Sequence, residues 1–192
     1  MATKKRKRCS WAVSNPLMKE YHDKEWGTPI HDDKLLFEFL VLEGVQAGLS
    51  WNIVLKKREN YRKAFEDFDY NKIANYSEKK VEKLIQNKGI IRNRRKIQAA
   101  IANAKAFLEI QKEFGSFDAY IWGFVHKPIQ NAYKSLEEIP AKTELSEKIS
   151  KDLKNRGFKF VGPTIIYAFM QAVGMVNDHT INCFRYKELR AS

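Results

Sequence analysis

Apolar residues recur at three- and four-residue spacing along most of the chain, which predicts a succession of helices. The first clear run starts at Asp32 or the residue after it, either of which supplies a helix cap, and continues to about Gln46. Residues 47–50 break this pattern, and Ser50 is placed to cap a second helix that continues through Tyr61. Two helices joined by a tight turn are therefore expected in this part of the chain.

Helical spacing continues to near the end of the sequence. Further helices are expected after four polar residues, each placed as a cap: Ser77, Asn93, Ser116 and Ser146. A last long helix is predicted over about 163–173, because proline is favoured in a first turn and glycine after a last one. Residues 128–143 are polar and contain prolines, which indicates a loop, and no strand-like alternation interrupts the helices. The predicted fold class is all-α.

The composition suits a packed body, since 44% of the 192 residues are hydrophobic and 12% are aromatic. We expect a single helical domain over residues 9–192, built of one or two lobes, after a disordered basic arm over residues 1–8. No run of about 20 apolar residues is present, and no apolar stretch typical of a signal peptide occurs at the start. A soluble, cytoplasmic (intracellular) protein with no membrane attachment is expected.

The net charge of +12 favours polyanionic partners, with nucleic acid first among them. Five positive residues in succession, Lys4–Arg8, form a segment suited to contact with phosphate. Charge alone does not identify the partner, because an ordinary basic surface has the same composition. A second basic stretch, which either follows a nucleic-acid backbone or is a solvated helix face, contains Arg92, Arg94, Arg95 and Lys96.

Two cysteines and two histidines form a candidate metal site. Twelve residues separate Cys9 from His22, and His179 and Cys183 form an H-x3-C pair that a helical turn would direct to one face. Such a set suits a closed, tetrahedral zinc site of structural type, which would join the two ends of the chain. The spacing is not that of common zinc fingers, so free thiols, a disulfide and hydrogen-bonded histidines remain alternatives. The other two histidines, at positions 31 and 126, have no such neighbours and are expected at the surface or in caps.

Residues 156–164 (RGFKFVGPT) join two predicted helices through a short basic turn, as in a helix-hairpin-helix. In that motif the N–H groups of the turn and of the next helix face a phosphate, so Lys159 and Gly162 are candidate DNA contacts. The usual turn has glycine where Phe160 stands, so a weaker contact is expected. A plain connection between helices is the alternative.

Eight segments, in this order, resemble the DNA-3-methyladenine glycosylase I family of the helix-hairpin-helix DNA glycosylase superfamily. The resemblance covers about residues 9–186 and includes CSW at 9–11, YHDKEWG at 21–27, LEG at 42–44, QAGLSW at 46–51, KKRENY at 56–61, GIIR at 89–92, RGFKFVG at 156–162 and VNDH at 176–179. The resemblance favours zinc at the Cys and His cluster.

The resemblance implies a monofunctional enzyme that flips 3-methyladenine out of double-stranded, alkylated DNA and hydrolyses its N-glycosidic bond. It implies an abasic site and the free base as products, and a monomeric protein. Thr164 stands where lyase-competent relatives carry a lysine, so the abasic site is expected to stay uncut. Two alternatives are a zinc-stabilised DNA-binding module without catalysis and a glycosylase for another lesion.

The expected catalytic residue is Glu43, a carboxylate on an otherwise apolar helix, where burial is costly unless the acid has a function. Its role by resemblance is to hydrogen-bond the base and stabilise its positive charge, while activation of water is left open. Trp51 is expected to stack on the base, Tyr21 to make a polar contact and Trp11 to complete the pocket, although aromatic residues also form cores.

The turn before Trp51 is the expected point of insertion into DNA. Leu49, next to Gly48, is a candidate wedge for the gap that a flipped nucleotide leaves, with a core leucine as the alternative. Asp178 occupies a place where many relatives in the superfamily carry a catalytic aspartate. It precedes the candidate ligand His179, so a capping role or support of that histidine is expected instead.

Overall fold

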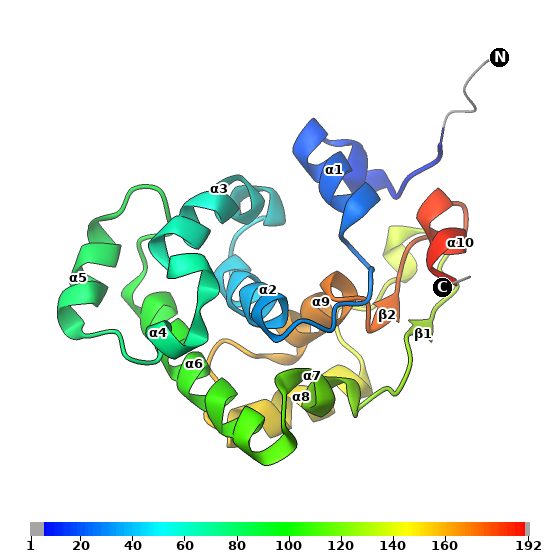
Figure 1. Ribbon diagram of the computed structural model, residues 1–192. Helices are drawn as coiled ribbons and strands as arrows, with labels where there is room; N and C mark the ends of the chain where they lie inside the picture. The colour runs from blue at the N-terminus through cyan, green and yellow to red at the C-terminus, as the bar shows by residue number, and fades with distance from the viewer. Residues whose placement is uncertain (1–5, 191–192) are drawn as a thin grey trace.

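The computed structural model describes residues 6–190, most of which are helical (Figure 1). The α-helices among these residues are α1 (Pro16–Lys24), α2 (Asp33–Gln46), α3 (Trp51–Ala64), α4 (Tyr70–Ile73), α5 (Glu78–Gln86), α6 (Arg94–Phe114), α7 (Phe117–Trp122), α8 (Glu144–Asn155), α9 (Pro163–Ala172) and α10 (Phe184–Arg190). Short 3-10 helices are η1 (Ser10–Val13), η2 (Glu66–Phe68) and η3 (Leu136–Glu138). The predicted all-α class is confirmed.

Helix α2 lies at the centre of the molecule (Figure 1) and packs against α3, α6, α7 and α9. Every residue from Leu36 to Val45 is buried, so this helix is covered on all sides rather than on one stripe. The hydrophobic core around it forms one contiguous cluster. Side chains on α2 therefore have no surface position along most of its length.

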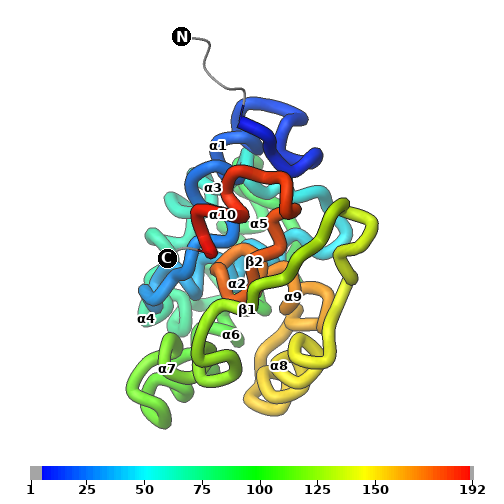
Figure 2. Tube along the Cα trace, turned by 90° about the vertical axis from the view of Figure 1, so that its right-hand side faces the viewer, coloured from blue at the N-terminus to red at the C-terminus, as the bar shows by residue number. Residues whose placement is uncertain are grey.

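The two ends of the described chain lie on the same side of the molecule, where α1, α10 and β2 are neighbours in both views (Figures 1 and 2). Strands β1 (Ile129–Gln130) and β2 (Val176–Asn177) form a parallel pair, in which Ile129 is opposite Val176. The sequence analysis missed these strands, because two residues are too short for an alternating pattern. They attach the loop after α7 to the segment that follows α9.

Most predicted helix starts are confirmed by their caps. The side chain of Asp32 accepts a hydrogen bond from Leu35 N at 2.8 Å, and the other caps that bond as expected are Ser77, Asn93 and Ser116. The prediction for α8 is wrong by three residues, since Thr143 is its cap and Ser146 completes a capping box. Ser50 precedes α3, but its side chain makes no capping bond.

Part of the expected basic arm packs on the folded body. Arg8 forms an ion pair with Asp23 at 2.7 Å, and the guanidinium of Arg6 lies 4.9 Å from the centre of the Phe184 ring. The arm was expected to extend to residue 8, and these contacts place residues 6–8 with the body. The rest of that expectation, residues 1–5, lies outside the described residues.

No helix within residues 6–190 is both long enough and apolar enough to cross a membrane.

Candidate functional site

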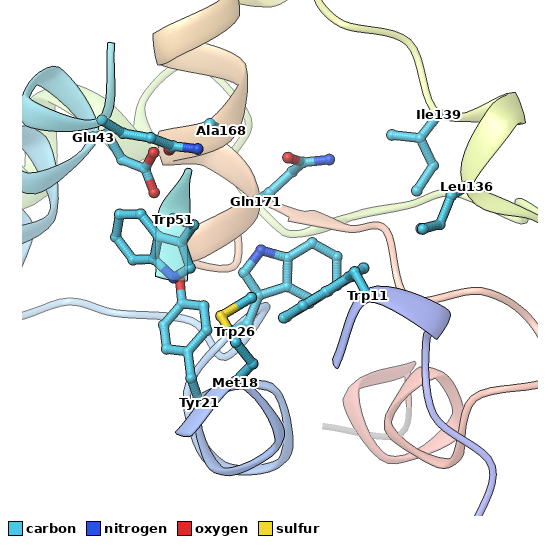
Figure 3. Close-up of a pocket in the computed structure, with 11 residues that line it drawn as sticks. Trp11, Met18, Tyr21, Trp26, Glu43, Trp51, Leu136, Ile139, Ala168 and Gln171 are labelled. Carbon is cyan, nitrogen blue, oxygen red and sulfur yellow. The ribbon is translucent and has the colours of Figure 1, made fainter. Parts of the chain in front are cut away.

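A pocket of about 350 Å³ opens between η1, α1, α2, the start of α3, η3 and α9. Figure 3 shows its lining side chains converging on one space from elements that are far apart in sequence. The lining residues are Trp11, Met18, Tyr21, Trp26, Glu43, Gln46, Trp51, Leu136, Ile139, Ala168 and Gln171. The four predicted residues Glu43, Trp51, Tyr21 and Trp11 are thus brought together.

Aromatic rings form two sides of this pocket (Figure 3). The ring centres of Tyr21 and Trp51 are 5.4 Å apart, and those of Trp11 and Trp26 are 5.0 Å apart with their planes at 80°. Trp11 and Trp51 are half-buried, so part of each ring is open to the pocket. Such surfaces suit a flat ligand that can stack between them.

Two buried carboxylates on α2 have opposite surroundings. Glu38 forms ion pairs with Arg58 and with Arg62, the latter at 2.8 Å. Glu43 is 4% exposed, and its Oε2 has no hydrogen-bond partner among residues 6–190. Burial raises the pKa of Glu43 to about 8, because an unpaired carboxylate is poorly solvated there. Glu43 therefore presents an unsatisfied acceptor to the pocket.

Hydrogen-bond donors face the same space. The indole N–H of Trp51 is buried and has no partner in the described part of the chain. Burial, and then the nearby charge of Glu43, raise the pKa of Tyr21 well above its usual value, so its hydroxyl stays protonated. Buried polar atoms without partners are rare in folded proteins. Two such atoms in one pocket, on Glu43 and Trp51, indicate a site for a polar ligand.

Asp178 supports the pocket wall rather than a histidine. Its carboxylate accepts hydrogen bonds from Tyr167 Oη at 2.6 Å, from Gln171 Nε2 at 2.7 Å and from Asn131 Nδ2 at 2.7 Å. The expectation that it orients His179 is wrong, because the outer nitrogen of that ring faces the carbonyl oxygen of Trp26 instead. Asp178 holds the amide of Gln171, which lines the pocket.

Cys9, His22, His179 and Cys183 form a buried cluster whose four candidate ligand atoms all lie within 4.8 Å of one another. His179 Nδ1 is 3.6 Å from the Sγ atoms of both cysteines and 3.2 Å from His22 Nε2. Cys183 Sγ is 3.4 Å from His22 Nε2. The cluster could hold a metal ion.

The outer nitrogens of the two histidines have partners that orient their rings. His22 Nδ1 lies 2.8 Å from Asp23 Oδ1, and His179 Nε2 lies 3.0 Å from the carbonyl oxygen of Trp26. Each ring therefore directs one nitrogen into the cluster and the other to an acceptor, as metal-binding histidines do. The H-x3-C pair is not on a helix as expected, since α10 begins only at Phe184 and a tight turn brings Cys183 to the cluster.

The remaining two histidines are at the surface, as expected. His31 stacks on Trp122 with ring centres 4.5 Å apart and contacts Asp118 at 2.8 Å, and His126 is exposed.

The α2–α3 turn, residues 47–50, lies beside the pocket and is called the wedge turn below. A groove that shares Glu43 with the pocket also contains Gly48 and Leu49, and its far side is formed by Thr164 and Ile165 at the start of α9. Gly48 has a φ of +77°, a conformation that glycine adopts without strain. Leu49 is half-buried and is not part of the contiguous core.

Residues 156–162 connect α8 to α9 and are called the hairpin turn below. Phe160 has a φ of +54°, so it adopts the left-handed conformation that a glycine would favour. Lys159 is exposed, and Gly162 is the cap residue of α9 without a side-chain capping bond. The first backbone N–H groups of α9 therefore donate no hydrogen bond to a cap side chain.

Two residues of the second basic stretch form ion pairs or hydrogen bonds with other parts of the protein. Arg94 forms ion pairs with Glu78 and Glu82, and Lys96 donates to backbone carbonyl groups. Both side chains therefore have partners within the protein, and contact of this stretch with a nucleic-acid backbone stays a prediction. Two other residues of the stretch, at positions 92 and 95, are exposed.

Several pocket residues were not singled out by the sequence analysis. Trp26 and Gln46 lie inside the quoted motifs, so the resemblance contained a signal for them. Leu136 and Ile139 lie in the segment predicted as a loop, and Gln171 lies on a helix with ordinary spacing. Only the packing of distant segments identifies these three.

Comparison with solved structures places this helical fold and its pocket in the class of DNA glycosylases. The chain is similar to a crystal structure of 3-methyladenine DNA glycosylase I, with a TM-score of 0.90 and 53% identity over 93% of this chain and 98% of that one. It is also similar to a variant of 3-methyladenine DNA glycosylase I in complex with 3-methyladenine, with a TM-score of 0.89 and 35% identity over 92% of this chain and 96% of that one.

The sequence model of the methyladenine glycosylase family matches residues 11–186, and the chain belongs to this family. DNA-3-methyladenine glycosylase 1 of Escherichia coli is 53% identical over 180 residues, which cover 93% of this chain and 96% of that protein. The resemblance found in the sequence motifs is confirmed.

Proposed function

We propose that this protein excises 3-methyladenine from alkylated, double-stranded DNA inside the cell, releasing the free base and leaving an uncut abasic site. The observation that carries the proposal is the buried, unpaired carboxylate of Glu43 in an aromatic pocket. Family membership and the structure of a relative in complex with 3-methyladenine support it. One chain supplies the whole lining of the pocket, so a second copy is not needed to complete it, and action as a monomer is part of this proposal.

The chemistry follows from the charge of the substrate. A base inside a duplex must be flipped out before an enzyme can reach its glycosidic bond. Methylation at N3 makes the adenine cationic, so the faces of Trp51 and Trp11 attract it and the carboxylate of Glu43 balances its charge. When the glycosidic bond breaks, its electron pair leaves with the base, which becomes neutral, and the sugar is left as a cation. Water then bonds to the sugar carbon and releases one proton to the solvent. Glu43 recognises the cation, Trp51 stacks on it, and the Tyr21 hydroxyl makes a polar contact.

Contacts with DNA are assigned to the two turns beside the pocket. Leu49 fills the gap left by the flipped nucleotide, and Gly48 gives the wedge turn its conformation. The hairpin turn acts as a helix-hairpin-helix, in which Lys159 and the backbone at Gly162 contact phosphate. The exposed position of Lys159 and the uncapped start of α9 support this role.

Zinc is the metal that best fits the cluster of Cys9, His22, His179 and Cys183. For a tetrahedral zinc ion, its usual bond lengths give separations of about 3.6 Å between sulfur and nitrogen ligands and about 3.3 Å between two nitrogens. Three of the four sulfur–nitrogen distances in the cluster are 3.4 to 3.6 Å, and its nitrogen–nitrogen distance is 3.2 Å. Four protein ligands leave no open position, so this zinc is structural.

The test is release of 3-methyladenine from methylated duplex DNA, with the product identified by chromatography. Glu43→Gln is expected to lower kcat/KM by about 100-fold, or roughly 2.7 kcal/mol, because the amide does not balance the cationic base. Glu109→Gln, an exposed substitution on α6, serves as the control and should match the wild type.

Two other results would decide against the proposal. Binding to DNA that weakens steeply with salt, without base release, would indicate a non-catalytic binding module. Release of another damaged base from a mixed-lesion duplex, unaffected by competing free 3-methyladenine, would indicate a different lesion.

A further inference from the structure

Helix α6 carries two polar side chains that hydrogen-bond the backbone of two separate turns. Lys96 Nζ donates to the carbonyl oxygens of Val45 and Ala47 at 2.6 and 2.7 Å. Asn103 Nδ2 donates to the carbonyl of Lys159 at 3.0 Å, and its Oδ1 accepts from the N–H of Lys159 at 2.7 Å. Each turn is thus held through its main chain, independently of the side chains that it presents.

The two anchors lie on one face of α6. Residues 96 and 103 are seven positions apart, which is two turns or about 10 Å along a helix axis. Val45 and Ala47 mark the end of α2, where carbonyl groups lack partners within the helix. The ammonium of Lys96 satisfies them and lies at the negative end of the helix dipole. Burial lowers its pKa, consistent with its position between helices.

The two anchored turns are neighbours across α2. A Cβ atom built on Gly44 would lie 3.3 Å from the Cβ of Phe160, so the hairpin turn rests directly on α2. A small cavity between α2 and α6 is lined by both anchors, Lys96 and Asn103. The wedge turn lies on the far side of the same region, opposite Thr164 at the start of α9. The spacing between the two turns is therefore set where α6 meets α2.

We propose that Lys96 and Asn103 are positioning residues that fix the distance between the wedge turn and the hairpin turn, so that both engage one DNA duplex at once. The inference rests on the proposed base excision. A flipped nucleotide is stable only if the phosphate anchor and the inserted side chain keep a set separation on a stiff duplex. Neither anchor lines the base pocket, so neither contacts the base.

The experiment separates the pocket from the DNA contacts with Lys96→Met and Asn103→Leu. Affinity for free 3-methyladenine, followed by tryptophan fluorescence, should stay within about twofold of the wild type. Affinity for undamaged duplex and kcat/KM for methylated duplex should each fall about tenfold, with most of the kinetic loss in KM. The control is Lys112→Met, which removes the same charge from the exposed end of α6.

Conservative variants keep the test decisive if a substitution unfolds the protein. Lys96→Arg retains donors for the carbonyls and should recover part of the loss, and Asn103→Asp retains only the acceptor and should be intermediate. Variants that match Lys112→Met on duplex DNA would overturn the proposal, as would a parallel loss of free-base affinity. If the wild type releases no 3-methyladenine, the proposed function fails, while duplex affinity still tests the spacing.

Discussion

At the residue scale, α2 contains two buried glutamates that differ in their ion-pair partners. Glu38 is neutralised by two arginines, so its burial is compensated. Glu43 has no such partner among the described residues, and the folded protein holds it at an energetic cost. That cost is recovered when a cation enters the pocket, because the incoming charge supplies the missing partner.

This cost predicts how stability depends on pH. The pKa of Glu43 rises from 4.5 to about 8 on folding. Below the unfolded value both states are protonated, while between the two values the folded state keeps a proton that the unfolded state loses, so stability falls as pH rises. Glu43→Gln removes this effect. The unfolding free energy of this variant minus that of the wild type should therefore increase by up to about 1.4 kcal/mol per pH unit between pH 6 and pH 8.

Urea unfolding at pH 6, 7 and 8 measures this gain, and the exposed Glu109→Gln variant should show none. A constant difference across the three pH values would contradict a raised pKa at Glu43.

The same ionisation predicts the pH profile of base release. The carboxylate form of Glu43 binds the cationic base, and in the empty pocket that form is populated only as pH approaches about 8. Wild-type kcat/KM should therefore increase with pH, with its midpoint near that value, and level off above it. The profile of Glu43→Gln should be flat over the same range, and a wild-type-like inflection in this variant would assign the titration to another group.

At the element scale, the turn after α9 is built against the segment that follows α1. Ile30 N donates to Val173 O at 3.1 Å, and Gly27 N donates to Gln171 O at 3.1 Å. Gly174 has a φ of +77°, and a Cβ atom there would lie 2.4 Å from Pro29 N. This turn therefore requires glycine for two reasons, the backbone conformation and the close approach of another main chain.

Gly174→Ala is expected to destabilise the protein by about 3 to 5 kcal/mol, since overpacking against backbone adds to the left-handed strain. Gly115→Ala is the matched control, because Gly115 has a φ of +85° but open space around it. It should lose only about 1 to 2 kcal/mol. If urea unfolding shows equal losses of unfolding free energy in the two variants, Pro29 moves away from the added methyl group at little cost.

At the scale of the whole molecule, the Cys and His cluster joins segments at opposite ends of the sequence. Cys9 and His22 flank η1 and most of α1, which together supply Trp11, Met18 and Tyr21 to the pocket. A metal ion in the cluster would hold this wall of the pocket against the segment after α9. Metal binding and pocket formation are therefore expected to be coupled.

Purified protein should contain about one zinc per chain, as measured by elemental analysis. Removal by a strong chelator, or Cys183→Ser, should lower the Tm by about 10 °C or more, because the binding energy of a structural zinc contributes to folding. His31→Ala, which changes a surface histidine, should keep both the metal and the Tm. Metal-free protein with an unchanged Tm would exclude a structural zinc.

What the sequence by itself determined about this protein was local or contained in long motifs. Helical spacing and capping residues such as Asp32 and Asn93 predicted most helices, because those signals act within a few residues. Helix α1 was not predicted, although Asn15 caps it and Pro16 stands in its first turn, and β1 was missed because two residues are too short for an alternating pattern. The ordered motifs identified the family and four pocket residues, since such motifs retain the chemistry of a site.

Only the tertiary structure decided which polar groups have partners. Glu38 and Glu43 lie five positions apart on one apolar helix, and only α3 shows that the first is paired and the second is free. From the sequence Lys96 is expected to be a surface charge, but its ammonium group donates a hydrogen bond to a carbonyl group at the end of α2. From the sequence Asp178 is expected to assist the neighbouring metal ligand, but its carboxylate accepts a hydrogen bond from Gln171. Pairing depends on side chains brought together from distant segments, and spacing along the chain does not contain that information.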